Sequence, residues 1–422
     1  MNLTTTEELV KTFNENSKKL SPAQSDVRKE AINAFQKQGF PGRKNEEWKY
    51  TNLAPVLGRD YLIDAATTLT KKDLEGLFLS SLEANHLVFV NGNFNKELST
   101  INAEEPVVIS DLSQAGDIND YLAASSITLN DSLTELNTAL ANGVVITVKK
   151  GKVVTKPVVL HFIGDSRNGN IFSNSRNLVI LEENSQATII EQYTTIGNNA
   201  NFSNNITQIV VKKDAFATYY KIQNDAKSDH VGTTQVYQPE KSNFAATTIT
   251  LDGGIIRNNL NIRLSSEYSE ASLVGLYMVK GTTHIDNHTL VDHAKPNCYS
   301  NELYKGLLDD KSTGVFNGKI YVRQDAQKTN AFQSNKNILL SKDATMNTKP
   351  QLEIFADDVK CSHGATTGMM DEEPLFYLRS RGISEKKAKA LLMHAFAADI
   401  LEYIKLEPLK ELLDQTILDR LS

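Results

Sequence analysis

The stretch TIIEQYTTIGNNANFSNNITQIVVKKDAFATYYKIQ (residues 188–223) decides the fold. It contains three short runs rich in β-branched and aromatic residues, at Thr188–Tyr193, Ile206–Val211 and Thr218–Gln223, separated by Asn-, Gly- and Asp-containing turns. No segment between the runs has the length or the 3.6-residue period of a crossover helix. These residues predict consecutive strands without intervening helices, which argues against a doubly wound parallel sheet.

The same texture extends from Val144 to about His363. The further strand-like runs are Val144–Val148, Val158–Ile163, Leu178–Leu181, Thr247–Leu251, Leu260–Leu264, Leu273–Val279, Gly314–Val322 and Leu352–Phe355. About two hundred residues of strand cannot form one flat sheet, so the sheet must close, split into a sandwich or coil. Polar pairs inside strands, such as Thr207-Gln208, favour a coil whose rungs stack on one another. We predict a mainly β protein with a solenoid core, and a large sandwich is the alternative.

Helical patterns flank this core on both sides. A helix is predicted over Pro22–Gln38, before Gly39 and Pro41, and shorter helical patterns lie near Lys71–Leu79 and Leu133–Ala141. After the core, Asp371, Ser384 and Pro408 mark the starts of three more helices. We therefore expect a mostly helical region at 1–142, a β core at 143–365 and a helical region at 366–422. The apolar stripes of the last region either pack on the end of the β core or also bind a partner protein.

Composition excludes several classes of protein. The 422 residues carry 45 basic and 51 acidic side chains, and a net charge of −6 gives no general attraction for nucleic acid. No apolar run is long enough to span a membrane, and residues 1–13 lack the character of a targeting peptide, so we expect a cytoplasmic protein. With only Cys298 and Cys361, this chain cannot build a disulfide framework or a Cys-rich metal site alone.

The common catalytic and nucleotide-binding motifs are absent, and two polar groups remain. The first group is His284, Asp286, His288, Asp292 and His293. On a strand, His284, Asp286 and His288 share one face about 7 Å apart, where they could hold a divalent metal or form a polar ladder between rungs.

The second group is Cys361-Ser362-His363. If this segment is extended, Cys361 and His363 share a face and could supply two of the four ligands of a metal, with the remainder coming from elsewhere, such as another chain. Two alternatives stay open. Cys361 could be a small buried hydrophobe beside a hydrogen-bonded His363, or the two could form a nucleophilic pair.

Three stretches resemble a known family. They are FPGRKNEEWKYT (40–51), HIDNHTLVDHAKPNCYSNELYKG (284–306) and residues 349–397, which begin KPQLEIFADDVKCSHGATTG. Together they resemble the SufB/SufD family of the SUF iron–sulfur cluster assembly complex, and its SufD branch in particular. The similarity spans essentially the whole chain.

The resemblance implies a right-handed parallel β-helix between helical regions, and a non-catalytic scaffold subunit. Such a subunit pairs with SufB through the β-helices and binds the SufC ATPase through its C-terminal helices, and it could pair with itself when alone. No cofactor is then bound tightly by this chain, but iron or a nascent cluster is shared transiently with SufB.

The resemblance also points to particular residues. It makes His363 the metal ligand and cluster-forming residue at the SufB interface, with Cys361 as a weaker candidate. SufB carries a cysteine where a rough alignment places Asn335 here, which favours SufD over SufB. Two other hypotheses remain, namely a β-solenoid enzyme acting on carbohydrate through carboxylates such as Asp286 and Asp292, and a homodimeric structural protein without chemistry.

Overall fold

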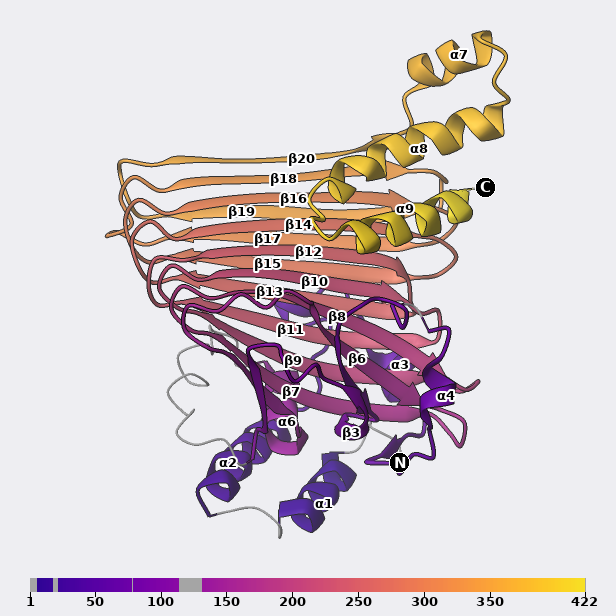
Figure 1. Ribbon diagram of the computed structural model, residues 1–422. Coiled ribbons are helices and arrows are strands. Elements are labelled where there is room, and N and C mark those ends of the chain that lie inside the picture. The colour runs from indigo at the N-terminus through magenta and orange to yellow at the C-terminus, as the bar shows by residue number, and fades with distance from the viewer. Residues whose placement is uncertain (1–5, 18–21, 78, 114–130, 422) are drawn as a thin grey trace.

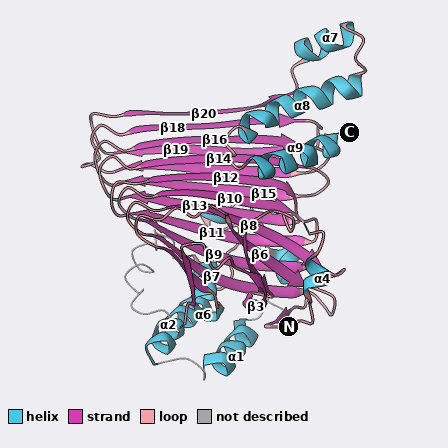
Figure 2. Cartoon of the chain, in the orientation of Figure 1, coloured by secondary structure: helices cyan, strands magenta, loops and turns pink. Residues whose placement is uncertain are grey.

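The computed structural model describes residues 6–17, 22–77, 79–113 and 131–421. Within these ranges the chain winds into a parallel β-helix (Figure 1). From β5 onward the odd-numbered strands form one sheet and the even-numbered strands the other, while β4 joins the odd sheet and β3 the even sheet. Helices lie at both ends of the chain, and Figure 2 separates them clearly from the strands. The prediction of a β solenoid flanked by helices is confirmed, and a sandwich is excluded because each sheet is parallel through its core.

The odd sheet consists of β4 (Val107–Asp111), β5 (Val144–Val148), β7 (Ile171–Leu181), β9 (Asn201–Val211), β11 (Ser228–Gln238), β13 (Ile255–Leu264), β15 (His284–His293), β17 (Thr313–Val322) and β19 (Thr345–Ile354), with β1 (Leu62–Ile63) paired to β7. The even sheet consists of β3 (Asn93–Thr100), β2 (Asn85–Val90), β6 (Val158–Asp165), β8 (Gln186–Ile196), β10 (Phe216–Asn224), β12 (Asn243–Asp252), β14 (Glu270–Val279), β16 (Tyr299–Leu308), β18 (Asn330–Leu339) and β20 (Lys360–Met369).

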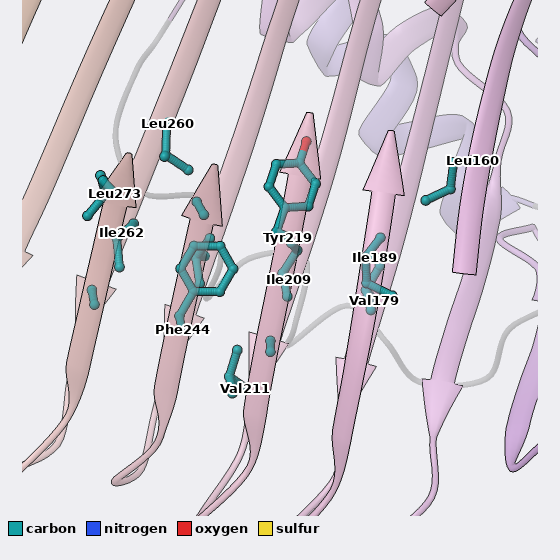
Figure 3. Close-up of a cluster of buried hydrophobic side chains, with 14 of the residues drawn as sticks. Leu160, Val179, Ile189, Ile209, Val211, Tyr219, Phe244, Leu260, Ile262 and Leu273 are labelled. Atoms are coloured by element: carbon teal, nitrogen blue, oxygen red, sulfur yellow. The ribbon is translucent and has the colours of Figure 1, made fainter. Parts of the chain in front are cut away.

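Alternate residues of the strands point into the space between the sheets, where one large apolar cluster extends along the coil and a separate one, with Ile320 and Val322, lies at its far end. Ile209 and Val211 from β9 meet Tyr219 from β10 and Phe244 from β12 there (Figure 3). Burying each such side chain contributes about 1.5–3 kcal/mol. Part of the interior is polar, and in-register amides satisfy one another, as when Asn258 Nδ2 donates to Asn287 Oδ1 at 3.2 Å. Of the polar pair noted in the sequence, Thr207 points into the coil and donates to Glu191, whereas Gln208 lies on the outer face and accepts from Arg176.

The N-terminal helices cover the outer face of the first coils. They are α1 (Thr6–Ser17), α2 (Pro22–Gln38), the 3-10 turn η1 (Glu46–Trp48), α3 (Ala54–Leu57), α4 (Lys71–Leu74) and α6 (Ser132–Leu140). Phe35 and Trp48 pack with Phe172 and Phe202 of the odd sheet. The bounds of α2 agree with the predicted helix. At this end β3 and β4 pair antiparallel with β2 and β5, so the first coils are covered.

The C-terminal helices α7 (Glu372–Ser380), α8 (Glu385–Leu401) and α9 (Glu407–Leu421) start where the sequence placed them. Asp371 caps α7, and Ser384 caps α8. Ile400 and Leu413 pack on the outer flank of the even sheet, beside Ile249 and Leu276, rather than on the end of the β core (Figure 1). Among the described residues, no strand pairs with the outer edges of β19 and β20, so we call this end of the coil the open end.

Candidate functional site

His363 lies on β20, the last strand of the even sheet. The inner neighbour of β20 is β18, where Gln333 is in register with His363 and Ala331 with Cys361. No described strand pairs with the other edge of β20. His363 is exposed and Cys361 is half-buried, so a molecule that covers this end would meet both side chains.

Both side chains belong to the inward-facing set of β20. Cys361 packs with Ile320, Val322 and Ala331, which line the interior of the coil. Since side chains alternate along a strand, His363 lies on the same face about 7 Å further along. The predicted shared face of Cys361 and His363 is therefore present, and it opens toward the end of the coil.

The thiol of Cys361 is held in its protonated form. Burial raises its pKa, and a backbone hydrogen bond with Ala331 offsets that effect in part. The thiolate is the form that binds metals, so Cys361 must lose a proton before it can act as a ligand. A histidine binds metals through a ring nitrogen.

This pair cannot complete a metal site by itself. Among the described residues, no group of three or more His, Cys, Asp and Glu side chains could hold a metal ion. Iron in a cluster needs about four ligands, counting the bridging sulfides. Any metal ion bound at this pair would therefore need ligands from another molecule.

Two buried polar residues lie behind His363 on the same inward face. Gln333 on β18 pairs with Glu302 on β16, and its Nε2 donates to Glu302 Oε2 at 2.7 Å. Burial raises the pKa of Glu302 to about 7, although hydrogen bonding with Thr289 and Gln333 opposes this. The sequence pattern did not single out these residues. Glu302 and Gln333 are 31 positions apart in the sequence, and Gln333 and His363 are 30 positions apart. The sequence alone does not give the length of one coil, so it does not show that these three residues share a register position.

Asn335, the position where SufB was expected to carry a cysteine, lies inside the coil. It is fully buried, and its Nδ2 donates to the Tyr277 hydroxyl at 3.0 Å and to the Tyr304 carbonyl oxygen at 3.3 Å. Its register partner on β20 is Ala365. Asn335 therefore serves the packing of the interior, next to the open end but behind it.

The His284 group takes part in a buried network on the outer face of the odd sheet. Asp286 makes an ion pair with Arg257 at 3.1 Å and lies 2.9 Å from His288, while Thr51 donates to it at 2.5 Å. Burial alone would raise the pKa of Asp286, but the charges of His288 and Arg257 outweigh it and lower that pKa well below its usual range. The ring of Trp48 covers Arg257 with 3.9 Å between guanidinium and ring centre.

This network joins the segment around residues 47–51 to the coil. It therefore connects two of the three stretches that carried the family resemblance, residues 40–51 and residues 284–306. His293 points the other way, into the interior, where its Nε2 lies 2.8 Å from the Ser300 hydroxyl. Asp292 is neutralised by Arg263 and Arg323. Asp286 and Asp292 are thus each bound to arginine and do not form the free carboxylate pair that a glycan-cleaving mechanism requires.

A cavity of about 310 Å³ lies at the opposite end of the coil, between α4 and strands β2 and β6. His86 and His161 stack in its wall, with His86 Nδ1 2.8 Å from His161 Nε2. The other nitrogen of His86 lies 2.9 Å from the Leu82 carbonyl oxygen, so both ring nitrogens of His86 are engaged.

Within the part of the chain that the structure describes, no helix is long and apolar enough to cross a membrane.

Comparison with known proteins gives consistent results along the chain. The family model "SUF system FeS cluster assembly, SufBD core domain" matches residues 162–396, and "SufBD protein N-terminal region" matches residues 3–160. An iron–sulfur cluster assembly protein SufD from Escherichia coli is 33% identical over 377 residues, covering 88% of this chain and 87% of that protein. A SufBD family protein from Synechocystis sp. is 32% identical over 395 residues, covering 90% and 87%. The chain belongs to the SufBD family of SUF iron–sulfur cluster assembly proteins.

Proposed function

We propose that this chain is a SufD-type scaffold subunit without catalytic activity of its own. It pairs with SufB through the open end of its β-helix, binds the SufC ATPase through its C-terminal helices, and contributes His363 to a transient iron or cluster site at the SufB interface. The observation that carries the proposal is the position of His363, exposed on the inward face of the last rung of the coil.

The open end is suited to pairing with another β-helix. A free strand edge presents unpaired backbone N–H and C=O groups, which a strand of a partner can satisfy. A partner coil that continues the stack would cover Cys361 and His363 and could place its own ligands opposite them. Cys361 is the weaker ligand because its thiol is protonated at rest.

The C-terminal region offers a separate surface for the ATPase. On α7, Phe376 is 72% exposed and Tyr377 is 57% exposed, while α8 and α9 are anchored to the flank of the even sheet. Exposed neighbouring aromatic side chains are typical of the centre of a protein interface. α7 follows the carboxyl end of β20, whereas His363 lies near the start of that strand, so the two partners would contact different parts of the chain.

The test is to co-express the chain with SufB and SufC, purify the complex without oxygen, and measure its composition, iron and sulfide after reconstitution. We expect His363→Ala to assemble with both partners but to lose at least tenfold in bound iron, because a ligand is missing. Ser362→Ala is the matched control, since it is the exposed neighbour on the outward face. Unchanged iron in the His363→Ala complex would refute the site.

A further inference from the structure

The residue behind His363 has a geometry that bears on how the histidine would bind iron. Strands β16, β18 and β20 stack in that order at the open end (Figure 1). Glu302, Gln333 and His363 occupy the same register position on the three strands. Neighbouring strands are about 4.8 Å apart, so side chains on the same face at one register position are within reach of each other.

The amide of Gln333 is held in place. Its residue is 3% exposed, and its Nε2 donates to the Glu302 carboxyl group at 2.7 Å. Gly318 on β17, across the interior, makes room for this amide, since a Cβ atom at position 318 would overlap with Gln333 Nε2. One side of the planar amide is therefore fixed, and so is the direction of its oxygen.

The oxygen of this amide has no hydrogen-bond partner. Among the described residues, none donates to Gln333 Oε1, although the atom is buried. A buried acceptor without a donor costs about 1–3 kcal/mol, and such an atom calls for an explanation. With the nitrogen committed to β16, the oxygen is left to meet a donor on the next rung, and His363 is the residue at that register position.

We propose that Gln333 is a positioning residue for His363, with its Oε1 accepting a hydrogen bond from one ring N–H of His363 when a partner covers the open end. This inference rests on the proposed iron-binding role of His363. A neutral imidazole has one N–H and one bare nitrogen, and the hydrogen bond decides which is which. Fixing one N–H on Gln333 leaves the other nitrogen bare and orients it for iron. Such acceptors also make the imidazole a stronger donor to the metal.

The experiment uses the whole complex with SufB and SufC, freed of iron, and Fe²⁺ alone as the probe. Fe²⁺ affinity is measured by competition with a chelator, and the reduction potential is measured after cluster reconstitution. The His363-dependent part of binding is the difference between the wild-type and His363→Ala complexes. Gln333→Met, which keeps the length of the side chain but lacks the amide, should weaken that part by about 10–100-fold and shift the potential upward.

Two further variants separate positioning from packing. Gln333→Glu in its protonated form donates to Glu302 and accepts from His363, so it should restore Fe²⁺ affinity. Asn335→Leu changes a buried amide on the same strand whose register partner is Ala365, and it should leave the affinity and the potential unchanged. If Gln333→Met binds Fe²⁺ as the wild type does while His363→Ala does not, the inference is overturned and the proposed function stands. If His363→Ala itself binds normally, the proposed site fails first.

Discussion

Glu302 is a carboxyl group placed where its charge is hard to accommodate. It is fully buried inside the coil, and burial raises its pKa to about 7 from the ordinary 4.5. The unfolded chain releases this proton near pH 4.5, whereas the folded chain keeps it until about pH 7. The folded state therefore binds more protons between these values, and the free energy of unfolding must fall as the pH rises through that window.

Glu302→Gln should remove this pH dependence, because the amide stays neutral. From about 1.4 kcal/mol per pKa unit, we expect the variant to be more stable than the wild type by roughly 3 kcal/mol at pH 8 and about equally stable at pH 4.5. Urea unfolding at the two pH values measures the effect. The exposed Glu270→Gln serves as the control, and an equal gain at both pH values would contradict the assignment to Glu302.

The candidate residues differ in how far their roles could be predicted from sequence. Alternation along a strand was enough to place His284, Asp286 and His288 on one face, and likewise Cys361 and His363. It could not show that the first group is covered by Trp48 and the segment around it, because that contact joins positions more than two hundred residues apart. Burial and long-range charge, which decide whether a polar group is structural or available, are properties of the folded chain.

At the level of elements, the sequence predicts the strands that contain apolar runs, but it does not predict the strands in which polar residues interrupt those runs. β11, β16 and β18 were not among the predicted strands, since residues such as Gln235, Asn301 and Asn335 break the apolar pattern. In a stacked coil an amide can be satisfied by the neighbouring rung, as when Asn335 Nδ2 donates to the Tyr304 carbonyl oxygen, so a strand can bury a polar side chain. The helices were easier to predict, because their caps and stripes are local signals, but the surface against which they pack was not.

The helix α7 allows a test of the proposed ATPase surface. Replacing both Phe376 and Tyr377 with serine should weaken binding to SufC at least about 30-fold, the effect of losing one aromatic anchor worth 2 kcal/mol or more at the centre of an interface. Both side chains are more than half exposed, so the free energy of unfolding should change little. Isothermal titration calorimetry with purified SufC gives the affinity.

The matched control for this helix is Tyr403→Ser, another partly exposed aromatic residue, located just after α8. It should bind SufC as the wild type does. An equal loss in the control and in the α7 variant would indicate a general disturbance of the C-terminal helices, and no loss in either would rule out α7 as the contact.

The whole molecule has one covered end and one open end. Antiparallel strands and helices cover the first coils, whereas no strand in the described part of the chain pairs with the outer edges of β19 and β20. The backbone N–H of Lys360 donates to the carbonyl oxygen of Thr329, on the side of β20 that faces β18. Backbone N–H groups alternate in direction along a strand, so the N–H of Ala365 points to the free edge. The chain on its own should therefore pair with a second copy through this edge.

Ala365→Pro should prevent that pairing and weaken association with SufB, because proline removes a free donor without breaking a bond to β18. Sedimentation analysis of the isolated chain over a range of concentrations measures the self-association. Ala365→Val retains the N–H and should pair normally. Dimers that persist in the proline variant would place the contact elsewhere.

Lys305 gives the open end a mechanical connection to the rest of the molecule. It lies on the outer face of β16, where its Nζ donates to the Phe396 carbonyl oxygen at 3.0 Å and makes an ion pair with Asp399. The same strand carries Glu302, which accepts a hydrogen bond from the side-chain amide of Gln333. A displacement of α8 would therefore act directly on β16, which lies two rungs from β20 and its histidine.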